Sequence, residues 1–354
     1  MTRPAFLLSA LLTFSLSSAE TTLLTPSSSE PANVSTSSPS FRIINGVQAS
    51  LSQFPYTVFI YSDLGDTGAA CGGTLIAPNV VVTAAHCLFD EETRIPVSSI
   101  SVSANSVSNI RTNTNVYSVS RSIPHPSFNT RTAANDIGLL ILSKNTNVPS
   151  SSFAKIYDLP ISNEIAIAAA GWGATSNDAN ATVSDVLMTV PLAISTSSNC
   201  KSLNPSYTNN NGMTICTANT NSQDTCYGDS GGPLVYTDVS PYPLLGLTSF
   251  GNAPPSAMTS ENERTPCAAA GGFGFYTHVN YYIDWIASTA SLDKSSITYS
   301  TGNFTSSSGQ AGTGNSTSPS AQKATGNGLS LKLQSNIVAA TAVLSAIIAL
   351  LNLV

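Results

Sequence analysis

The chain has 354 residues, 9% of them charged, and a formal net charge of −6 at pH 7. This length leaves room for one all-β domain with a sizeable core after the low-complexity ends are set aside. Proteins that bind nucleic acid need a basic face. With 13 Lys and Arg against 19 Asp and Glu, the chain supplies none, and we expect no nucleic-acid partner.

The first 19 residues have the pattern of a secretory signal peptide. Arg3 precedes an apolar run over residues 5–16, and small residues up to Ala19 form the cleavage site. The run is too short to span a bilayer comfortably, which makes a membrane anchor the less favoured interpretation. Residues 20–42 follow as a propeptide. Most of residues 25–40 are Ser, Thr, Pro and Asn, a composition that cannot pack a core.

Between residues 43 and 290, short β-rich runs alternate with turn-forming residues. Many short strands at this spacing predict an antiparallel barrel or sandwich. Such runs occur at residues 57–60, 80–82, 137–142, 187–190 and 244–247. Residues 281–290 place their apolar side chains on one face and predict a helix at the end of the domain.

The C-terminal part of the sequence predicts a stalk and then a signal for a glycosylphosphatidylinositol (GPI) anchor. Residues 291–327 are rich in Ser, Thr and Gly, and we expect an unfolded, glycosylated stalk. Residues 328–354 complete a small-residue site, a polar spacer and an apolar tail, which is the order that a GPI signal requires. A permanent membrane helix is the alternative. The expected location is therefore secreted or on the outer cell surface, with membrane attachment by the lipid anchor.

Sequons and cysteines agree with an exported chain. Glycosylation sites are expected at Asn33, Asn180, Asn303 and Asn315. Six cysteines in such a chain favour three disulfides over metal binding or redox chemistry. No CxxC or HxxxH pair occurs, and the acids at positions 90–92 form no calcium loop, so we expect no metal and no cofactor.

Three motifs carry residues suited to nucleophilic catalysis. His86 in TAAHC lies between a small-residue turn and a cysteine, which would hold a base rigidly. Asp136 in NDIGLL leads into an apolar strand, where a partly buried carboxylate needs a partner. Ser230 in GDSGGP is flanked by glycines that allow a sharp backbone. A serine becomes a good nucleophile when a base, itself oriented by a third group, takes its proton. The other histidines, His125 and His278, lack such surroundings and are expected at the surface.

In their order along the chain, these motifs resemble the chymotrypsin family of serine peptidases, trypsin in particular. The resemblance runs over residues 43–290 and includes GWG at 171–173 and RIING at 42–46. It implies an all-β fold of two antiparallel six-stranded barrels with a C-terminal helix. It also implies an endopeptidase that cuts protein or peptide substrates after Arg or Lys through an acyl-enzyme. Ser230 would be the nucleophile, His86 the general base and Asp136 the orienting carboxylate.

The same resemblance assigns the binding groups. The backbone N–H groups of Gly228 and Ser230 would form an oxyanion hole. Asp224, six residues before Ser230, would lie at the base of the pocket for the residue before the cleaved bond, where a carboxylate pairs with Arg or Lys. The pocket walls are matched by Ser249, Gly251 and Gly274.

Activation and disulfide pairing also follow from the resemblance. Cleavage after Arg42 would free the amino group of Ile43 to pair with Asp229 and switch a loop between two arrangements. Because Arg42 is itself basic, we expect the enzyme to be able to activate its own precursor. The implied disulfides are Cys71–Cys87, Cys200–Cys216 and Cys226–Cys267.

The chain departs from the family pattern in residues 252–266, a longer stretch than usual that we expect at the rim of the cleft. Phe250 stands where the family commonly has tryptophan. Two other classes of function are a catalytically silent relative that serves as a surface binding protein and a structural glycoprotein. The three intact motifs favour the enzyme, which we expect to be a monomer with peptide substrates and proteinaceous inhibitors as partners.

Overall fold

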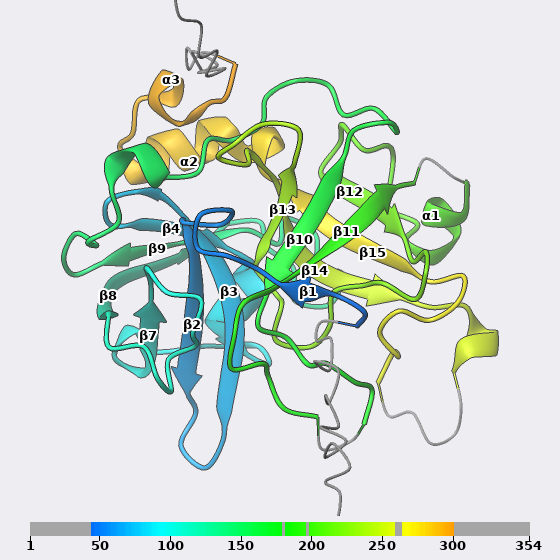
Figure 1. Ribbon diagram of the computed structural model, residues 1–354, viewed down its shortest axis with the longest axis horizontal. Helices are drawn as coiled ribbons and strands as arrows, with labels where there is room; N and C mark the ends of the chain where they lie inside the picture. Colours follow the sequence, from blue (N-terminus) through cyan, green and yellow to red (C-terminus); the bar gives the residue numbers. More distant parts are fainter. Residues whose placement is uncertain (1–43, 179–180, 196–197, 259–263, 301–354) are drawn as a thin grey trace, which may run out of the picture. The chain divides into compact units, whose positions relative to one another are not determined.

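Two antiparallel β-barrels dominate the described residues (Figure 1). The structure, a computed structural model, describes residues 44–178, 181–195, 198–258 and 264–300. Several predicted features lie outside these residues: the signal peptide, the propeptide with Arg42, the new terminus Ile43, the sequons Asn33, Asn180, Asn303 and Asn315, and the stalk and anchor signal beyond residue 300.

The first barrel is a closed ring of six strands. In ring order they are β2 (Thr57–Asp63), β3 (Gly68–Ala77), β4 (Val80–Thr83), β9 (Gly138–Leu142), β8 (Val116–Pro124) and β7 (Ile100–Ser103). The sequences of β4 and β9, VVVT and GLLIL, are almost continuously apolar. All their residues except Ile141 are buried, as expected for strands that are covered on both faces.

The second barrel also has six strands, and the pairing of β11 with β12 closes it. Its strands in order are β11 (Met188–Ile194), β10 (Ile167–Gly171), β13 (Pro233–Tyr236), β14 (Leu244–Asn252), β15 (Phe273–His278) and β12 (Thr214–Ala218). The short β1 (Val47–Gln48) adds to β11. The predicted double six-stranded antiparallel barrel is confirmed.

Short elements connect the strands. They are the hairpin β5 (Phe89–Asp90) and β6 (Thr93–Arg94), the helices α1 (Ser198–Leu203), α2 (Ile283–Ala290) and α3 (Lys294–Ile297), and 3₁₀ turns at Ala85–Leu88, Val97–Ser99, Ser150–Ser152, Pro255–Ala257 and Val279–Tyr282. The helix predicted over 281–290 corresponds to α2 and the 3₁₀ turn before it. Each helix among the described residues is too short or too polar to cross a membrane.

Buried side chains and disulfides hold the barrels and their loops together. Trp172, which follows β10, packs edge-on against Phe59 of β2 with ring centroids 5.6 Å apart, so the core is continuous across the two barrels. All three predicted disulfides are present: Cys71–Cys87, Cys200–Cys216 and Cys226–Cys267. The first joins β3 to the 3₁₀ turn at Ala85–Leu88, and the third joins two loops of the second barrel.

The fold continues past residue 290, where the stalk was expected to begin. In α3, Asp293 accepts a hydrogen bond from the backbone of Ser295 at 3.0 Å and caps the helix. Ile297 is only 1% exposed and belongs to the main core. Backbone hydrogen bonds from Ile156 to Ile297 (2.7 Å) and from Tyr299 to Ile156 (2.9 Å) fix this segment. The predicted boundary at 290 is therefore too early.

We expect Ile297→Ala to lower the free energy of unfolding by about 2–5 kcal/mol, because it removes a fully buried side chain and leaves a cavity. Urea unfolding of the disulfide-intact protein measures this loss. Val97→Ala is the control, since Val97 is 37% exposed and its truncation should change stability by no more than about 0.5 kcal/mol. Equal, small losses in both variants would show that the segment after residue 290 adds nothing to the fold.

Candidate active site

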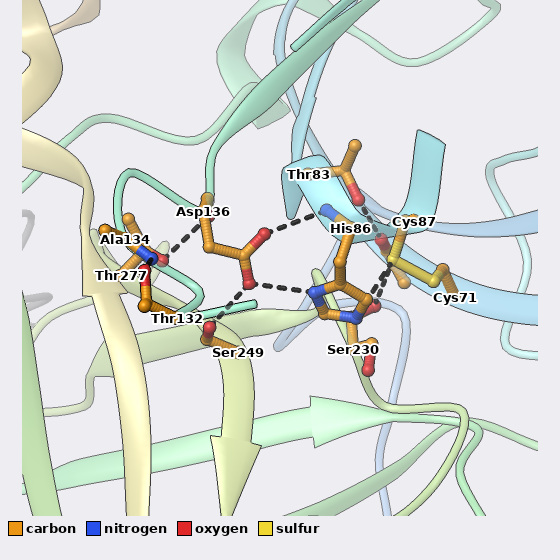
Figure 2. Close-up of polar contacts among 11 residues, drawn as sticks. Cys71, Thr83, His86, Cys87, Thr132, Ala134, Asp136, Ser230, Ser249 and Thr277 are labelled. Carbon is orange, nitrogen blue, oxygen red and sulfur yellow. Dashed lines mark hydrogen bonds and ion pairs between the residues drawn. A yellow bond between two sulfur atoms is a disulfide. The ribbon is translucent and has the colours of Figure 1, made fainter. Parts of the chain in front are cut away.

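His86 lies in the 3₁₀ turn that follows β4, at the junction of the two barrels (Figure 2). The small side chains of Ala84 and Ala85 are fully buried, which allows the turn to pack closely on the barrel. The Cys71–Cys87 disulfide ties the next residue to β3. Close packing and the disulfide therefore both hold the turn that carries His86.

Asp136 precedes β9, and its side chain is buried beside His86. One carboxylate oxygen, Oδ2, lies 2.8 Å from His86 Nδ1 and accepts a hydrogen bond from Ser249 Oγ at 2.5 Å. The other, Oδ1, accepts from the backbone N–H of His86 at 2.9 Å. Thr277 Oγ1 donates to the backbone carbonyl of Asp136 at 2.7 Å. Figure 2 shows these contacts converging on Asp136 from both barrels.

These contacts set the charges of the pair. Burial alone would raise the pKa of Asp136, but the charge and hydrogen bonds of His86, with the Ser249 hydroxyl, hold the pKa below its ordinary value. Burial lowers the pKa of His86, and the charge and hydrogen bond of Asp136 outweigh it, so the net pKa lies above 6.5. Asp136 is therefore ionised, and the neutral imidazole keeps its proton on Nδ1, which leaves Nε2 as an acceptor.

Ser230 lies on the Nε2 side of this imidazole (Figure 2). The sulfur of Cys87 is 3.8 Å from His86 Nε2 and 3.6 Å from the carbonyl oxygen of Ser230, which shows how close the two residues are. That carbonyl accepts a hydrogen bond from the backbone of Gly72 at 2.7 Å, so β3 holds the serine loop in place. The three motifs, far apart in sequence, thus meet at one point.

The backbone before Ser230 has a conformation that needs glycine. Gly228 has φ +97°, and a Cβ there would come within 2.8 Å of Val183 Cγ1. Among the described residues, neither the N–H of Gly228 nor that of Ser230 has a hydrogen-bond acceptor. The loop therefore offers two unpaired donors beside the serine.

Asp229 is a second buried carboxylate, with a side chain that no solvent reaches. It accepts hydrogen bonds from the backbone N–H groups of Gly173 (2.7 Å) and Cys226 (2.8 Å). A Cβ at Gly173 would lie 2.3 Å from Asp229 Oδ2, which explains the glycine in GWG. Burial raises the pKa of Asp229 to about 7, and no cation among the described residues pairs with it.

Asp224 lines a cavity of about 290 Å³ that also reaches Ser230. Its side chain is buried and accepts hydrogen bonds from the backbone of Thr225 (2.8 Å) and Ala268 (3.2 Å). Burial outweighs these bonds and raises the pKa of Asp224 to about 6. The cavity therefore contains a carboxylate that has no cation among the described residues.

The predicted wall residues occupy different places. Ser249 and Gly251 line the cavity, as expected. Gly274 does not line it; it pairs with Gly251 across β14 and β15, and a Cβ there would meet Thr217 Oγ1 at 2.8 Å. Ser249 also bonds Asp136, a contact that sequence reasoning missed because no local motif indicates it.

Comparison with known proteins agrees with this geometry. The family profile described as Trypsin matches residues 43–286. This chain belongs to the trypsin family. Its relatives include Trypsin-1 of Astacus astacus, 30% identical over 258 residues that cover 70% of this chain and all of the relative. Trypsin alpha of Drosophila melanogaster is 30% identical over 259 residues, with 71% and 88% covered, and human Kallikrein-12 is 28% identical over 250 residues, with 69% and 89% covered.

The 252–266 stretch reaches the cavity with both of its described parts, and Asn252 lines the cavity at the first of them. Thr265 and Pro266 line the cavity, and Tyr227 donates a hydrogen bond from its hydroxyl to the carbonyl of Thr265 at 2.8 Å. The guanidinium of Arg264 lies over the Tyr227 ring, 5.2 Å from its centroid. Phe250 lines the cavity and stacks on Phe275 with ring centroids 4.9 Å apart, so this part of the cavity wall is aromatic.

The two remaining histidines are not part of the site. His278, expected at the surface, is only 4% exposed, so that prediction is wrong. It ends β15, all of whose residues are buried, and its Nδ1 lies 2.9 Å from the carbonyl of Gly212. His125 is half-buried against the rings of Tyr282 and Trp285.

We expect Asp136→Asn to lower the pKa of His86 below 6.5, because burial would then act without the charge that opposes it. Proton NMR titration of the imidazole signals measures the change, and three histidines make the assignment tractable. The pKa of His125, whose described side-chain contacts are with Ser127, Tyr282 and Trp285, serves as the internal control. A His86 pKa that stayed above 6.5 in the variant would mean that Asp136 is not its main partner.

Proposed function

We propose that this trypsin-family protein is an endopeptidase that cleaves after Arg or Lys. The observation that carries the proposal is the buried Asp224 carboxylate, which lies in the same cavity as Ser230 and has no cation among the described residues. A long basic side chain that entered the cavity would bring the missing charge to Asp224. Such a side chain would also leave the carbonyl of its own residue next to Ser230.

In the proposed reaction, Ser230 Oγ attacks the substrate carbonyl while His86 Nε2 accepts the hydroxyl proton. The ionised Asp136 holds the imidazole in place and stabilises the imidazolium that forms. The negative charge that develops on the carbonyl oxygen is stabilised by the N–H groups of Gly228 and Ser230. The imidazolium then gives its proton to the leaving amine, which produces the acyl-enzyme. Water, deprotonated by His86, releases the acid and restores the serine.

Cleavage between Arg42 and Ile43 is the proposed activation step, and the described neighbours of Ile43 support it. Ile44 forms an antiparallel bridge with Asp224, so the chain beside the new terminus already lies next to the segment that ends at Ser230. The buried Asp229 in that segment has no cation among the described residues, and a terminal ammonium group would supply one. Because the cleaved bond follows an arginine, the enzyme is also proposed to act on its own precursor.

The remaining proposals concern location and partners. The signal-peptide and GPI-signal patterns support a monomeric enzyme that is secreted or held on the outer surface by a lipid anchor. Asn33, Asn180, Asn303 and Asn315 are its proposed glycosylation sites. Proteins that present an arginine or lysine to the Asp224 cavity are the proposed substrates and inhibitors.

Enzyme that begins at Ile43 is expected to release fluorophore from a peptide ending in Arg or Lys and not from its Phe counterpart. Asp224→Ser should lower kcat/KM for the Arg peptide by about 10²–10³-fold, because a buried cation would then lack its partner. Steady-state kinetics with matched Arg, Lys and Phe peptides measures the preference.

Ser230→Ala is the control for catalysis and should abolish all turnover. A preference for Phe would keep the catalytic assignment and overturn the role of Asp224. No turnover of any peptide, with Ile43 verified as the terminus, would favour the catalytically silent binding protein.

Incubated precursor is expected to gain activity as Ile43 becomes its terminus, and Arg42→Gln should block both changes. Without a basic residue before the bond, the cavity would have no ligand for Asp224. N-terminal sequencing and the Arg-peptide assay follow the two events together. Ser230→Ala precursor separates self-cleavage from a contaminating protease, because it should stay intact. Maturation of Arg42→Gln at Ile43 would contradict the proposal.

A further inference from the structure

Asn45 joins the start of the described chain to the loop that carries Asp224. Its side-chain nitrogen donates to the carbonyl of Ser222 at 2.9 Å. In return, the side-chain nitrogen of Gln223 donates to the carbonyl of Asn45 at 3.3 Å. With the adjacent bridge between Ile44 and Asp224, these contacts make a short reciprocal connection, here called the Asn45 latch.

Both sides of the latch have unusual backbone. Asn45 has φ +55°, and Asn221 and Ser222 have φ +55° and +54°. Two successive non-glycine residues in the left-handed region are strained unless other contacts hold them. The Asn45 amide supplies such a contact at Ser222, two residues before Asp224. The conformation that presents Asp224 therefore depends in part on a side chain from the other end of the domain.

We propose that Asn45 is a positioning residue that couples docking of the mature amino terminus to the arrangement of the Asp224 loop. The proposal rests on the proposed activation at Ile43 and goes beyond it by assigning the coupling to one side chain. Asparagine suits the position because it tolerates positive φ better than most residues and also carries an N–H donor. Glycine tolerates the positive φ but has no side-chain donor. Aspartate has a side chain of the same shape as asparagine, but its ionised carboxylate cannot donate a hydrogen bond.

The consequence can be measured through pH. The charged amino group of Ile43 is the docking group, with an ordinary pKa near 7.7–8.0. Pairing with Asp229 raises that pKa, so loss of the amino proton weakens docking about tenfold per pH unit above the ordinary pKa. Among the described residues, Asp224 is the other charged group that acts on Asp229. The backbone N–H groups of Gly173 and Cys226 and the backbone of Gly171 and Gly173 also lie against the Asp229 carboxylate. If the Asn45 latch is weakened, docking of the amino terminus is weaker at every pH. The enzyme then loses its activity at a lower pH on the alkaline side.

The test uses enzyme that begins at Ile43 and carries Asn45→Gly or Asn45→Asp. Loss of one hydrogen bond should weaken docking about two- to tenfold, which lowers the midpoint of the alkaline limb by about 0.3–1 pH unit. The readout is kcat/KM for the Arg peptide between pH 7 and pH 11. Gln223→Met, which removes the return hydrogen bond, should shift the midpoint in the same direction.

Asn105→Gly and Asn105→Asp are the matched controls. Asn105 also has φ +55°, but it follows β7 in the first barrel, so its variants should leave the midpoint unchanged. Thermal unfolding at pH 7 shows that every variant is folded. If the Asn45 variants have the same midpoint as the Asn105 variants, the proposed coupling through Asn45 is wrong. If the unsubstituted enzyme has no alkaline limb, or gains no activity on maturation, the proposed activation itself is wrong.

Discussion

The two barrels meet at the buried carboxylate of Asp136, and the site depends on how that charge is satisfied. His86, from the first barrel, supplies two of its hydrogen bonds, and Ser249, from the second barrel, supplies the third. Thr277, also from the second barrel, holds the backbone of Asp136. A buried carboxylate that lost these partners would cost several kcal/mol, so the carboxylate also fixes the barrels relative to each other. The same contacts that orient His86 thus hold the two barrels in a fixed position relative to each other.

Much of this arrangement could be predicted from sequence, because its main residues sit in short local motifs. TAAHC, NDIGLL and GDSGGP each specify a turn or strand end, and the family resemblance supplied the double barrel and the disulfide pairing. What the sequence could not indicate arises from contacts between distant strands. The hydrogen bond from Ser249 to Asp136 is one case, and the pairing of Gly274 with Gly251 outside the cavity lining is another. Ile297 was missed because one apolar residue in a polar segment has no periodicity.

Several contacts fasten the 252–266 stretch at the rim of the cavity. The Cys226–Cys267 disulfide and the hydrogen bond from Tyr227 to Thr265 attach the long 252–266 stretch to the loop that carries Ser230. Asn177 adds two hydrogen bonds to the backbone of Cys267, at 2.7 and 3.0 Å. Three loops are therefore fastened at one edge of the cavity. In the proposed enzyme, substrate residues beyond the basic one would lie near this edge, and we expect the edge to influence which of them are preferred.

Asp224 and Asp229 form the two ends of one short segment, and both are buried carboxylates with raised pKa values. Each charge disfavours the other, since Asp224 adds to the rise in the pKa of Asp229. A cation at either carboxylate therefore removes part of the repulsion and favours ionisation of the other. In the proposed enzyme, those cations are the substrate side chain and the Ile43 amino group. Coupling between two binding events is reciprocal. If docking of the terminus strengthens substrate binding by a certain factor, substrate in the cavity strengthens docking of the terminus by the same factor.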